Sequence, residues 1–335
     1  MKYTTTHIEE TKIDISVIIV NYKSWNHLEN CLNGLNKIDT KAFSFEVIVV
    51  DNCSNDNKLE HFEAKFPEFR FLLNSGNYGF SHGNNFGARN AKGAYFLFLN
   101  PDTVVNTTAL SEMLELAKSN PDYGIISCSK IKPTGTLEKE TRLFPKIQTL
   151  FGVLRIFHTL FNKRMIAERF NETKTVIFPD WVSGSIIFIS KSWFLKVGGW
   201  SEDYWLYLED VDLCKRVSKA NGKIALTRNS QIIHNHGGAS RSNVKTAALT
   251  KAEVIISKHV YINSHFKQPN KILAQFALKT FGMLFKSILA LLGLIFFFIP
   301  KLHVLLLLFL NLVQYYVNAM VKGSWLSKRA PNYYQ

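Results

Sequence analysis

Residues 15–20 read ISVIIV and residues 45–50 read FEVIVV. Both are short apolar runs rich in β-branched residues, and each is followed at once by a polar residue, Asn21 or Asp51. Such runs are typical of parallel strands that are buried on both faces. Residues 24–35 carry apolar side chains at helical spacing between the two runs, so the three segments predict a β-α-β unit.

Further strands are predicted at residues 70–73, 95–99 and 125–131, with helices at 84–91 and 108–118. The first half of the chain is therefore predicted to be an open α/β sheet. Ligands of such sheets bind beyond the carboxyl ends of the strands. Here those ends are Asn21, Asp51, Asn74 and the turn at residues 100–102. The second half predicts strands at 181–189, 224–227 and 231–233, and helices at 191–197 and 211–220.

Length and composition narrow the class of protein. With 335 residues and 47% hydrophobic content, the chain can bury a large core. One sizeable folded domain with an additional part is therefore expected, and a disordered chain is not. The four cysteines are widely spaced and form no metal-finger pattern, which indicates reduced thiols in the cytosol. The polar N-terminus lacks the apolar core of a secretory signal.

The formal charge of +14 is concentrated near the C-terminus. Residues 254–335 hold nine Lys and Arg residues and no Asp or Glu. Basic residues that flank apolar runs indicate a membrane surface and not nucleic acid. The apolar runs are residues 273–299 and 302–321, each about the length that spans a bilayer, ~20 residues. Each also carries a polar stripe, which suits helices lying in the membrane interface. Packing within a soluble protein or a dimer interface is the alternative.

Residues 74–87 (NSGNYGFSHGNNFG) are dense in Gly and Asn, which let a ligand approach the backbone. The stretch does not fit GxxxxGK[ST], and no GxGxxG follows the first strand. A Walker ATPase and a dinucleotide dehydrogenase are thus disfavoured. A flexible surface loop is the alternative.

Residues 198–216 (GGWSEDYWLYLEDVDLCKR) place Glu209, Asp210 and Asp212 beside aromatic residues. Partial desolvation raises the pKa of a carboxyl group, so one of the three is a candidate general base. Acidic residues at a helix N-terminus, complementing the helix dipole, are the alternative.

Other motifs are weak alone. Asp102 ends the LNPD turn at residues 99–102, and one exposed carboxylate is enough for Mg²⁺ or Mn²⁺ when a diphosphate supplies other ligands. The same turn is common without a metal. His234 and His236 in HNHGG are candidate metal ligands or structural histidines. Residues 130–174 are basic and predict a solvated, mobile face, from which Arg142 stands out as a phosphate contact.

In combination and in order, these motifs resemble inverting nucleotide-sugar transferases of glycosyltransferase family 2, and within it bacterial rhamnosyltransferase-type enzymes of surface polysaccharide synthesis. The resemblance covers residues 14–240. The motifs that carry it are VIIVNYKSW (17–25), VIVVDNCSND (47–56), NSGNYGFSHGNNFG (74–87), FLNPD (98–102), the acidic stretch (198–216) and HNHGG (234–238). It implies a GT-A fold, a Rossmann-like mostly parallel α/β sheet flanked by helices, with a C-terminal hydrophobic helical segment.

The domain organisation follows from this. Residues 1–250 are expected to form the catalytic domain, with a nucleotide-sugar half at about 14–130 and an acceptor half at 131–250. Residues 251–335 are expected to be a basic, apolar, membrane-associating segment.

The resemblance also implies roles for individual residues. The donor nucleotide is expected at Val20, Asn21, Tyr22, Asp51, Asn77, Gly79 and Asn85, with Asp51 bonded to the pyrimidine ring. A divalent metal, Mg²⁺ or Mn²⁺, is expected on Asp102 with His234 or His236, because Asn100 stands where many members have a second Asp. The HxxG spacing favours His234. Contacts to the acceptor or diphosphate are expected from Arg142, Trp181, Gly184, Trp205, Tyr207 and Glu209, although core packing is an alternative use of the aromatic ones.

Asp210 matches the family's catalytic base. The expected reaction moves rhamnose from dTDP-rhamnose to a glycan or polyprenyl-diphosphate-linked acceptor at the cytoplasmic face of the plasma membrane. A UDP-hexose or UDP-HexNAc donor competes, since Asp51 accepts a bond from N3–H of uracil and thymine alike. A catalytically silent, membrane-associated nucleotide-binding scaffold is an alternative of another class. No nucleic-acid partner is expected, and a homo-oligomer is compatible with the sequence.

Overall fold

The computed structural model describes residues 13–150, 152–171, 173–235 and 243–334. The strands are β1 (Ile15–Asn21), β2 (Phe45–Asp51), β3 (Arg70–Leu73), β4 (Tyr95–Leu99), β5 (Thr103–Val104), β6 (Tyr123–Ile131), β7 (Val176–Ile177), β8 (Ile186–Ser190) and β9 (Lys223–His234). The helices are α1 (Trp25–Leu35), α2 (Leu59–Lys65), α3 (Gly79–Arg89), α4 (Thr107–Ser119), α5 (Gly152–Phe161), α6 (Lys163–Arg169), α7 (Lys191–Lys196), α8 (Glu209–Lys219), α9 (Val244–His265), α10 (Asn270–Ile295) and α11 (Pro300–Lys322). Two short 3-10 turns are η1 (Ile147–Thr149) and η3 (Pro331–Tyr334).

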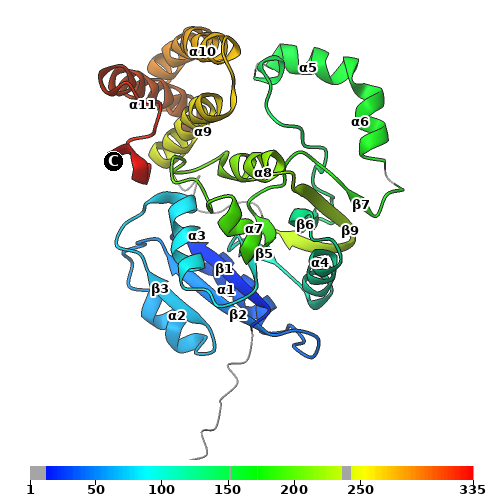
Figure 1. The fold of residues 1–335 in the computed structure, drawn as a ribbon. Coiled ribbons are helices and arrows are strands. Elements are labelled where there is room, and N and C mark those ends of the chain that lie inside the picture. Colours follow the sequence, from blue (N-terminus) through cyan, green and yellow to red (C-terminus); the bar gives the residue numbers. More distant parts are fainter. Residues whose placement is uncertain (1–12, 151, 172, 236–242, 335) are drawn as a thin grey trace, which may run out of the picture.

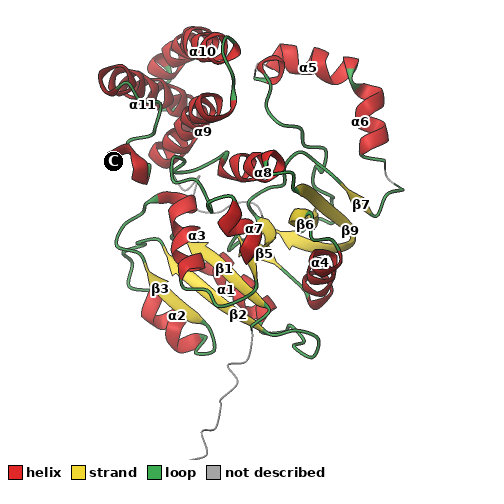
Figure 2. Cartoon of the chain, in the orientation of Figure 1, coloured by secondary structure: helices red, strands yellow, loops and turns green. Residues whose placement is uncertain are grey.

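All these strands belong to one mixed sheet with the order β3-β2-β1-β4-β8-β6-β9-β5, and β7 pairs with β9 (Figure 2). The first four strands of this order are parallel, as the sequence predicted. β8 then runs antiparallel to both β4 and β6, so the second half departs from a purely parallel arrangement. β6 and β9 are parallel again.

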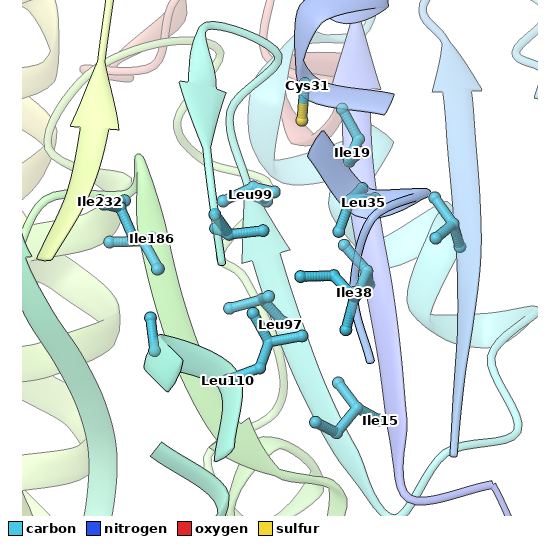
Figure 3. Close-up of a cluster of buried hydrophobic side chains, with 14 of the residues drawn as sticks. Ile15, Ile19, Cys31, Leu35, Ile38, Leu97, Leu99, Leu110, Ile186 and Ile232 are labelled. Atoms are coloured by element: carbon cyan, nitrogen blue, oxygen red, sulfur yellow. The ribbon is translucent and has the colours of Figure 1, made fainter. Parts of the chain in front are cut away.

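Helices cover both faces of the sheet. One face packs against α1, α2 and α4, and part of this apolar cluster is seen in Figure 3. The other face packs against α3, α7, α8 and the end of α9. Every residue of β1 is buried, and β1 is parallel to both of its neighbours. The prediction that residues 15–20 form a buried parallel strand is therefore confirmed.

The glycine-rich stretch at 74–87 is not a long loop, because α3 begins at Gly79. Its many Gly and Asn residues have low helix propensity, so sequence reasoning started this helix only at residue 84. The packing explains them: a Cβ atom at Gly83 would lie 2.8 Å from Val20, and one at Gly87 would lie 2.5 Å from Ile18. The small residues let α3 lie close on the sheet.

Other predicted boundaries of strands were also wrong. The strand expected from residue 181 begins at Ile186, because residues 183–185 form a turn used by the site. The strands expected at 224–227 and 231–233 are one strand, β9, with a bulge after Thr227. The elements β5, β7, α2, α5 and α6 were not predicted, and α9 begins before the helical segment expected from residue 251. Two of them are two-residue strands, which are too short to show a periodicity.

The C-terminal helices α9, α10 and α11 pack together at one end of the molecule (Figure 1). Ala252 and Ile256 of α9 contact Leu308 and Leu312 of α11 in a small apolar cluster of their own. α9 is continuous from residue 244 to 265 and also packs on the sheet through Val260. The hydrophobic helical segment is therefore joined to the α/β layer by a rigid helix.

Candidate active site

The carboxyl ends of β1 and β2 lie side by side, because Asn21 pairs with Asp51 in register. Asp51 is buried, and its Oδ1 accepts hydrogen bonds from the Asn21 amide at 3.3 Å and from the Ser54 hydroxyl at 2.5 Å. The Ser54 N–H donates to Oδ2 at 3.0 Å. Val20 is buried beside them and Tyr22 is exposed. The carboxylate of Asp51 is thus held in one orientation at the predicted ligand-binding edge.

A net of side-chain amides extends this edge toward α3. The Asn74 amide donates to Oδ1 of Asn52 at 2.9 Å, and the Asn52 amide donates to Oδ1 of Asn77 at 3.0 Å. Asn52 also donates to the carbonyl of Gly79 at 3.1 Å. The ends of β2 and β3 are therefore joined to the start of α3, which brings Asn77 and Gly79 to the same edge as Asp51.

Gly79 lies directly against the acidic stretch. The carbonyl of Trp205 accepts a hydrogen bond from the N–H of Phe80 at 3.0 Å, and the Trp205 indole donates to the carbonyl of Asn77 at 3.2 Å. Gly79 has φ +90°, and a Cβ atom there would lie 2.1 Å from the Trp205 carbonyl oxygen. Only glycine permits both this conformation and this approach. Trp205 thereby joins the predicted donor and acceptor sides.

Asn85 serves the same junction. Its amide donates to the carbonyl of Trp200 at 2.9 Å and to Glu202 at 2.8 Å, and its Oδ1 accepts from the N–H of Trp200 at 3.0 Å. Asn85 therefore holds residues 200–202, and its expected part in donor binding stays a prediction.

His234 and Asp102 face each other, with 3.5 Å between Nε2 of His234 and Oδ1 of Asp102. They meet because Thr103 of β5 pairs with His234 at the end of β9. The N–H of Asn235 also donates to the carbonyl of Asp102 at 2.7 Å. The structure thus brings Asp102 and His234 together, while His236 lies outside the described residues, so the choice between the two histidines as metal ligand stays a prediction.

Glu138, which sequence reasoning missed, orients His234. Its Oε1 lies 2.6 Å from Nδ1 of His234, and its other oxygen lies 3.5 Å from Nζ of Lys130. A carboxylate on Nδ1 favours the tautomer whose Nε2 can coordinate a metal. Lys130 is buried and donates to the Ser185 hydroxyl at 2.9 Å. Burial lowers the pKa of Lys130, and the Glu138 carboxylate opposes this.

Asp102 and His234 fit a divalent cation. Oδ1 of Asp102 is buried and has no hydrogen-bond partner among the described residues, although carboxylate oxygens are normally satisfied. No cluster of three or more metal-ligating side chains occurs in the described parts of the chain. Mg²⁺ and similar ions commonly take one or two protein ligands and complete their shell with substrate phosphates and water. These two residues suit that mode of binding.

Asp210 lies in the first turn of α8. Its Oδ2 accepts a hydrogen bond from the N–H of Gly184 at 2.9 Å, and its Oδ1 accepts from the N–H of Val211 at 2.8 Å. Burial raises the pKa of this carboxyl, while these backbone bonds and the charges of Arg142 and Lys130 act in the opposite direction. A carboxylate that is desolvated yet held ionised by donors is suited to accept a proton.

Glu209 is the more buried neighbour of Asp210. Its Oε2 has no hydrogen-bond partner among the described residues. Burial and the adjacent Asp210 raise its pKa well above the usual range for a glutamate. The two acids therefore differ in environment: both oxygens of Asp210 accept backbone hydrogen bonds, whereas Oε2 of Glu209 has no partner among the described residues.

The backbone just before these acids is strained. Tyr207 has φ +74° and Leu208 has φ +64°, both in the left-handed region that bulky residues avoid. Such conformations cost about 1–3 kcal/mol each and gather at functional sites. Here they turn the chain sharply from Trp205 into α8, which aims Asp210 at the turn of residues 183–185.

That turn connects Asp210 to the metal-binding side. The N–H of Gly184 bonds Asp210, and the carbonyl of the next residue, Ser185, accepts from the N–H of Asn100 at 3.0 Å. Asn100 lies two residues before Asp102. The candidate base and the candidate metal ligand are therefore held on either side of one short segment.

Arg142 stacks on Trp181, with 4.5 Å between the guanidinium carbon and the ring centroid. The Trp181 indole donates to the carbonyl of Leu143 at 3.1 Å, which fixes the ring. Arg142 is close enough to Asp210 to influence its pKa. The structure thus brings two predicted contact residues, Arg142 and Trp181, to the same side as Asp210.

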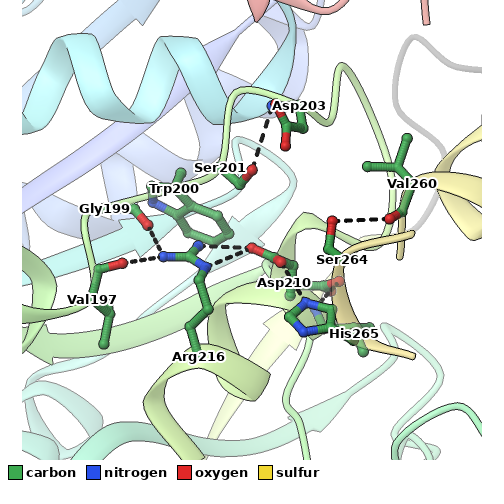
Figure 4. A network of polar contacts seen from close by, with 12 residues as sticks. Val197, Gly199, Trp200, Ser201, Asp203, Asp210, Arg216, Val260, Ser264 and His265 are labelled. Atoms are coloured by element: carbon green, nitrogen blue, oxygen red, sulfur yellow. Dashed lines mark hydrogen bonds and ion pairs between the residues drawn. The ribbon is translucent and has the colours of Figure 1, made fainter. Parts of the chain in front are cut away.

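Asp212 has a structural environment. Its Oδ2 binds Arg216 at 2.8 Å and its Oδ1 lies 2.7 Å from Nε2 of His265 in α9. Figure 4 shows Arg216 between this histidine and the carbonyl groups of Val197 and Gly199, to which it donates. Asp212 therefore joins α8 to α9.

Three further residues of the site, Lys130, Glu138 and Ser185, carried no signal in the sequence analysis. Lys130 and Glu138 stand among other charges in a basic stretch that was expected to be solvated. Both are nearly inaccessible instead. Only the pairing of β6 with β9 shows that Lys130 runs beside the strand that ends in His234.

Comparison with known proteins places this geometry in a family. Residues 16–183, half of the chain, match the model of Glycosyl transferase family 2. The chain belongs to glycosyltransferase family 2. Residues 170–236 match a second model, the N-terminal domain of galactosyltransferase. The resemblance drawn from the motifs is therefore confirmed.

Named relatives of this glycosyltransferase are 25–29% identical to it over about two thirds of its length. The low-salt glycan biosynthesis hexosyltransferase Agl10 of Haloferax volcanii is 29% identical, over 69% of this chain and 70% of its own. The rhamnosyltransferase WbbL of Escherichia coli is 27% identical, over 66% and 83%. The N-acetylglucosaminyl-diphospho-decaprenol L-rhamnosyltransferase of Mycobacterium tuberculosis is 25% identical, over 66% and 75%.

Solved structures confirm the GT-A fold of this family 2 enzyme. GalNAc-T7 with UDP, GalNAc and Mn²⁺ matches with a TM-score of 0.54 and 15% identity, over 76% of this chain and 51% of that one. The mannosyltransferase PcManGT of Pyrobaculum calidifontis with GDP-Man and Mn²⁺ matches with a TM-score of 0.52 and 15% identity, over 82% and 71%. At these identities the likeness speaks for the fold alone.

Proposed function

We propose that this enzyme transfers rhamnose from dTDP-rhamnose, with inversion, to a lipid-linked glycan acceptor at the cytoplasmic face of the plasma membrane. One observation carries the chemistry: Gly184 and Ser185 hold Asp210 on one side and the Asn100 to Asp102 turn on the other. A proton acceptor and a site for the leaving diphosphate are thus fixed relative to each other. Two named rhamnosyltransferases among the relatives support the choice of sugar.

In this proposal Asp210 is the general base. The acceptor hydroxyl attacks the anomeric carbon from the face opposite the diphosphate and transfers its proton to Asp210. The bond from the anomeric carbon to the phosphate oxygen breaks, and its electron pair leaves with the diphosphate. Inversion follows from attack on the opposite face. Because burial raises the pKa of Asp210, its basicity is greater than that of an exposed aspartate.

Cationic groups would receive the leaving diphosphate. Asp102 and His234 would hold the divalent cation, whose chemistry when bound is to neutralise charge on the leaving group. Glu138 would orient His234 through Nδ1. Arg142, whose charge reaches Asp210, would contact phosphate or acceptor oxygens from the other side.

The donor nucleotide would lie at the edge formed by β1, β2 and the start of α3, with Asp51 bonded to the pyrimidine ring. The fixed orientation of Asp51 by Ser54 supports this placement. Trp205 and Tyr207 would face the sugars, since their segment packs on the start of α3.

The membrane-associating segment at 251–335 is part of the proposal. α10 and α11 are both long and apolar enough to cross a membrane, and only 17% and 28% of their most apolar windows are buried. A core helix of a soluble protein would be mostly buried. Gln275 of α10 faces inward, because this buried side chain bonds both the ring and the carbonyl of His259 in α9. A bundle with polar contacts inside and apolar side chains outside suits lipid.

A UDP-HexNAc or UDP-hexose donor is the second candidate. It is supported by a relative named poly(ribitol-phosphate) beta-N-acetylglucosaminyltransferase TarS, 27% identical over 49% of this chain, and by the hexosyltransferase Agl10.

A donor panel separates the candidates. The purified full chain is tested by thermal shift against dTDP-rhamnose, UDP-GlcNAc and UDP-glucose, each with and without Mn²⁺, because a ligand of the native state raises the melting temperature. We expect the largest metal-dependent shift with dTDP-rhamnose. A larger shift with a UDP-sugar would select the second candidate, and no shift with any nucleotide would favour the silent scaffold.

A further inference from the structure

Helix α5 exposes an apolar face that nothing described in the structure covers. Phe157 and Leu160 are more than half exposed, and Phe161 is 87% exposed. Among the residues that the structure describes, no side chain of α5 joins any of the hydrophobic clusters. Solvated helices rarely carry several large apolar side chains on one face, so this face indicates a partner.

The same segment is strongly basic. Residues 141–167 contain no Asp or Glu, whereas Arg155 in α5 and Lys163 and Arg164 at the start of α6 are exposed cations. A short helix with aromatic and aliphatic side chains on one side and Lys and Arg around it is the pattern of an interfacial membrane helix. The charge is complementary to a surface of anionic lipid.

The position of α5 relative to the C-terminal helices is fixed by the turn that precedes it. Ile147 and Leu150 pack against Ile262 of α9 and Leu278 of α10. Figure 1 shows α5 at the same end of the molecule as α10 and α11. Two helical regions that are distant in sequence therefore point toward one side of the enzyme.

Cations of α5, α9 and α10 also lie near one another. Lys258 of α9 lies within electrostatic reach of Arg155 in α5 and of Lys286 in α10. None of the three forms an ion pair with a described residue. Like charges left unpaired in this way are destabilising unless an anion lies between them.

The outward face of α10 continues the apolar surface. Phe276, Leu284, Ile288, Leu291 and Ile295 recur at helical spacing and are all more than half exposed. Arg155 and Lys286 therefore stand on the same two helices as the exposed apolar side chains.

We propose that α5 and the outward face of α10 form one docking surface for an anionic phospholipid bilayer, with Arg155, Lys163 and Arg164 at the level of the head groups. This rests on the proposed function only in its membrane location, and it adds a contact outside the C-terminal segment. The consequence is an orientation: Arg142, which stacks on Trp181 at the active site, lies on the chain that leads into η1 and α5. The acceptor side of the active site would then face the lipid.

The test measures immersion of α5 in a bilayer. The full chain, in a Cys53→Ser background, carries a nitroxide on Phe161→Cys or, as the matched control, on Glu63→Cys of α2, at the opposite end of the molecule. Each labelled protein is reconstituted either into bilayers that contain phosphatidylglycerol or into bilayers of phosphatidylcholine alone. We expect residue 161 in anionic bilayers to be relaxed more by oxygen than by a water-soluble nickel chelate, and residue 63 to show the reverse.

A set of charge-removing variants tests the preference for anionic lipid. Arg155→Gln/Lys163→Gln/Arg164→Gln should reduce the immersion of residue 161 in anionic bilayers, whereas Lys41→Gln/Lys92→Gln/Lys118→Gln should leave it unchanged. Equal access of the nickel chelate to residues 161 and 63 would overturn the proposal, and so would immersion that is the same in phosphatidylcholine alone. Metal-dependent binding of dTDP in detergent is measured on the same samples, so that loss of donor binding, which concerns the proposed function, is told apart from loss of docking.

Discussion

Nε2 of His234 lies 3.5 Å from Oδ1 of Asp102, although the two residues are far apart in the sequence. The pairing of β5 with the end of β9 produces this contact, and Glu138 holds the other ring nitrogen.

Glu138→Gln should weaken metal binding about 10–100-fold, as loss of an outer carboxylate usually does. The measurement is the Mn²⁺ concentration that gives half of the dTDP-induced thermal shift. Glu140→Gln is the matched control, because this buried carboxylate two residues away bonds Ser129 and Arg228 instead. It should lower the melting temperature without changing the metal requirement. If the two variants change that requirement equally, Glu138 has no special part in it.

Asp210→Asn should lower kcat about 10²–10⁴-fold, the usual contribution of a general base, with little change in donor affinity. The amide keeps the size of the side chain and can still accept the hydrogen bond from Gly184. Transfer to acceptor and binding of the donor are measured separately. Asp122→Asn, an exposed acid paired with Lys223, serves as the control. Transfer by Asp210→Asn at the wild-type rate would remove Asp210 from this role.

The acidic limb of the kcat profile should lie at a higher pH than the ordinary aspartate pKa of 3.8, because burial raises the pKa of Asp210 and only the ionised form accepts a proton. The charge of Lys130 opposes that rise. Lys130→Met should therefore move the limb to still higher pH, whereas exposed Lys132→Met should not. Coinciding limbs for Lys130→Met and the wild type would show that Lys130 does not act on the base.

Glu209→Gln should change how stability depends on pH. Burial raises the folded-state pKa of Glu209, so its contribution is fully present below its usual pKa of 4.5 and is lost as pH rises through the folded value. Glutamine does not ionise, so the variant should lack this loss and gain a few degrees in melting temperature relative to the wild type at alkaline pH. Parallel unfolding curves for the two proteins from acidic to alkaline pH would contradict the assignment.

Gly79→Ala should destabilise the enzyme by at least about 3 kcal/mol, because it adds a steric collision to an unfavourable backbone conformation. The new Cβ atom would lie 2.1 Å from the carbonyl oxygen of Trp205. Gly135→Ala is the matched control, since Gly135 has φ +79° but no atom within 4 Å of an added Cβ. It should cost only about 1–2 kcal/mol. Urea unfolding measures the free energy of unfolding of both variants. Equal decreases would mean that the segment at Trp205 moves aside without any loss of stability.

Much of the first half of the enzyme was predictable from its sequence. β1, β2 and β4 are apolar runs that end in polar residues, and α1 has a clear apolar face, so local periodicity was sufficient. Asp210 and Asp102 were chosen as candidates because short motifs with a chemical reason occur in the family's order, and their roles stay predictions. α3 was predicted too short, because its glycines serve packing against Ile18 and Val20 and not local helix stability.

Local sequence patterns were enough to predict the alternation of strands and helices, the family, and the two apolar C-terminal helices, since each depends on neighbouring residues in the chain. The tertiary structure decided what depends on pairing between distant segments: that β8 is antiparallel, that β5 brings Asp102 to His234, and that Glu138 and Lys130 are buried beside them. Burial of a charge depends on the elements that enclose it, and no local pattern records those. For this reason a basic stretch that was expected to be solvated supplied both Lys130 and the exposed helix α5.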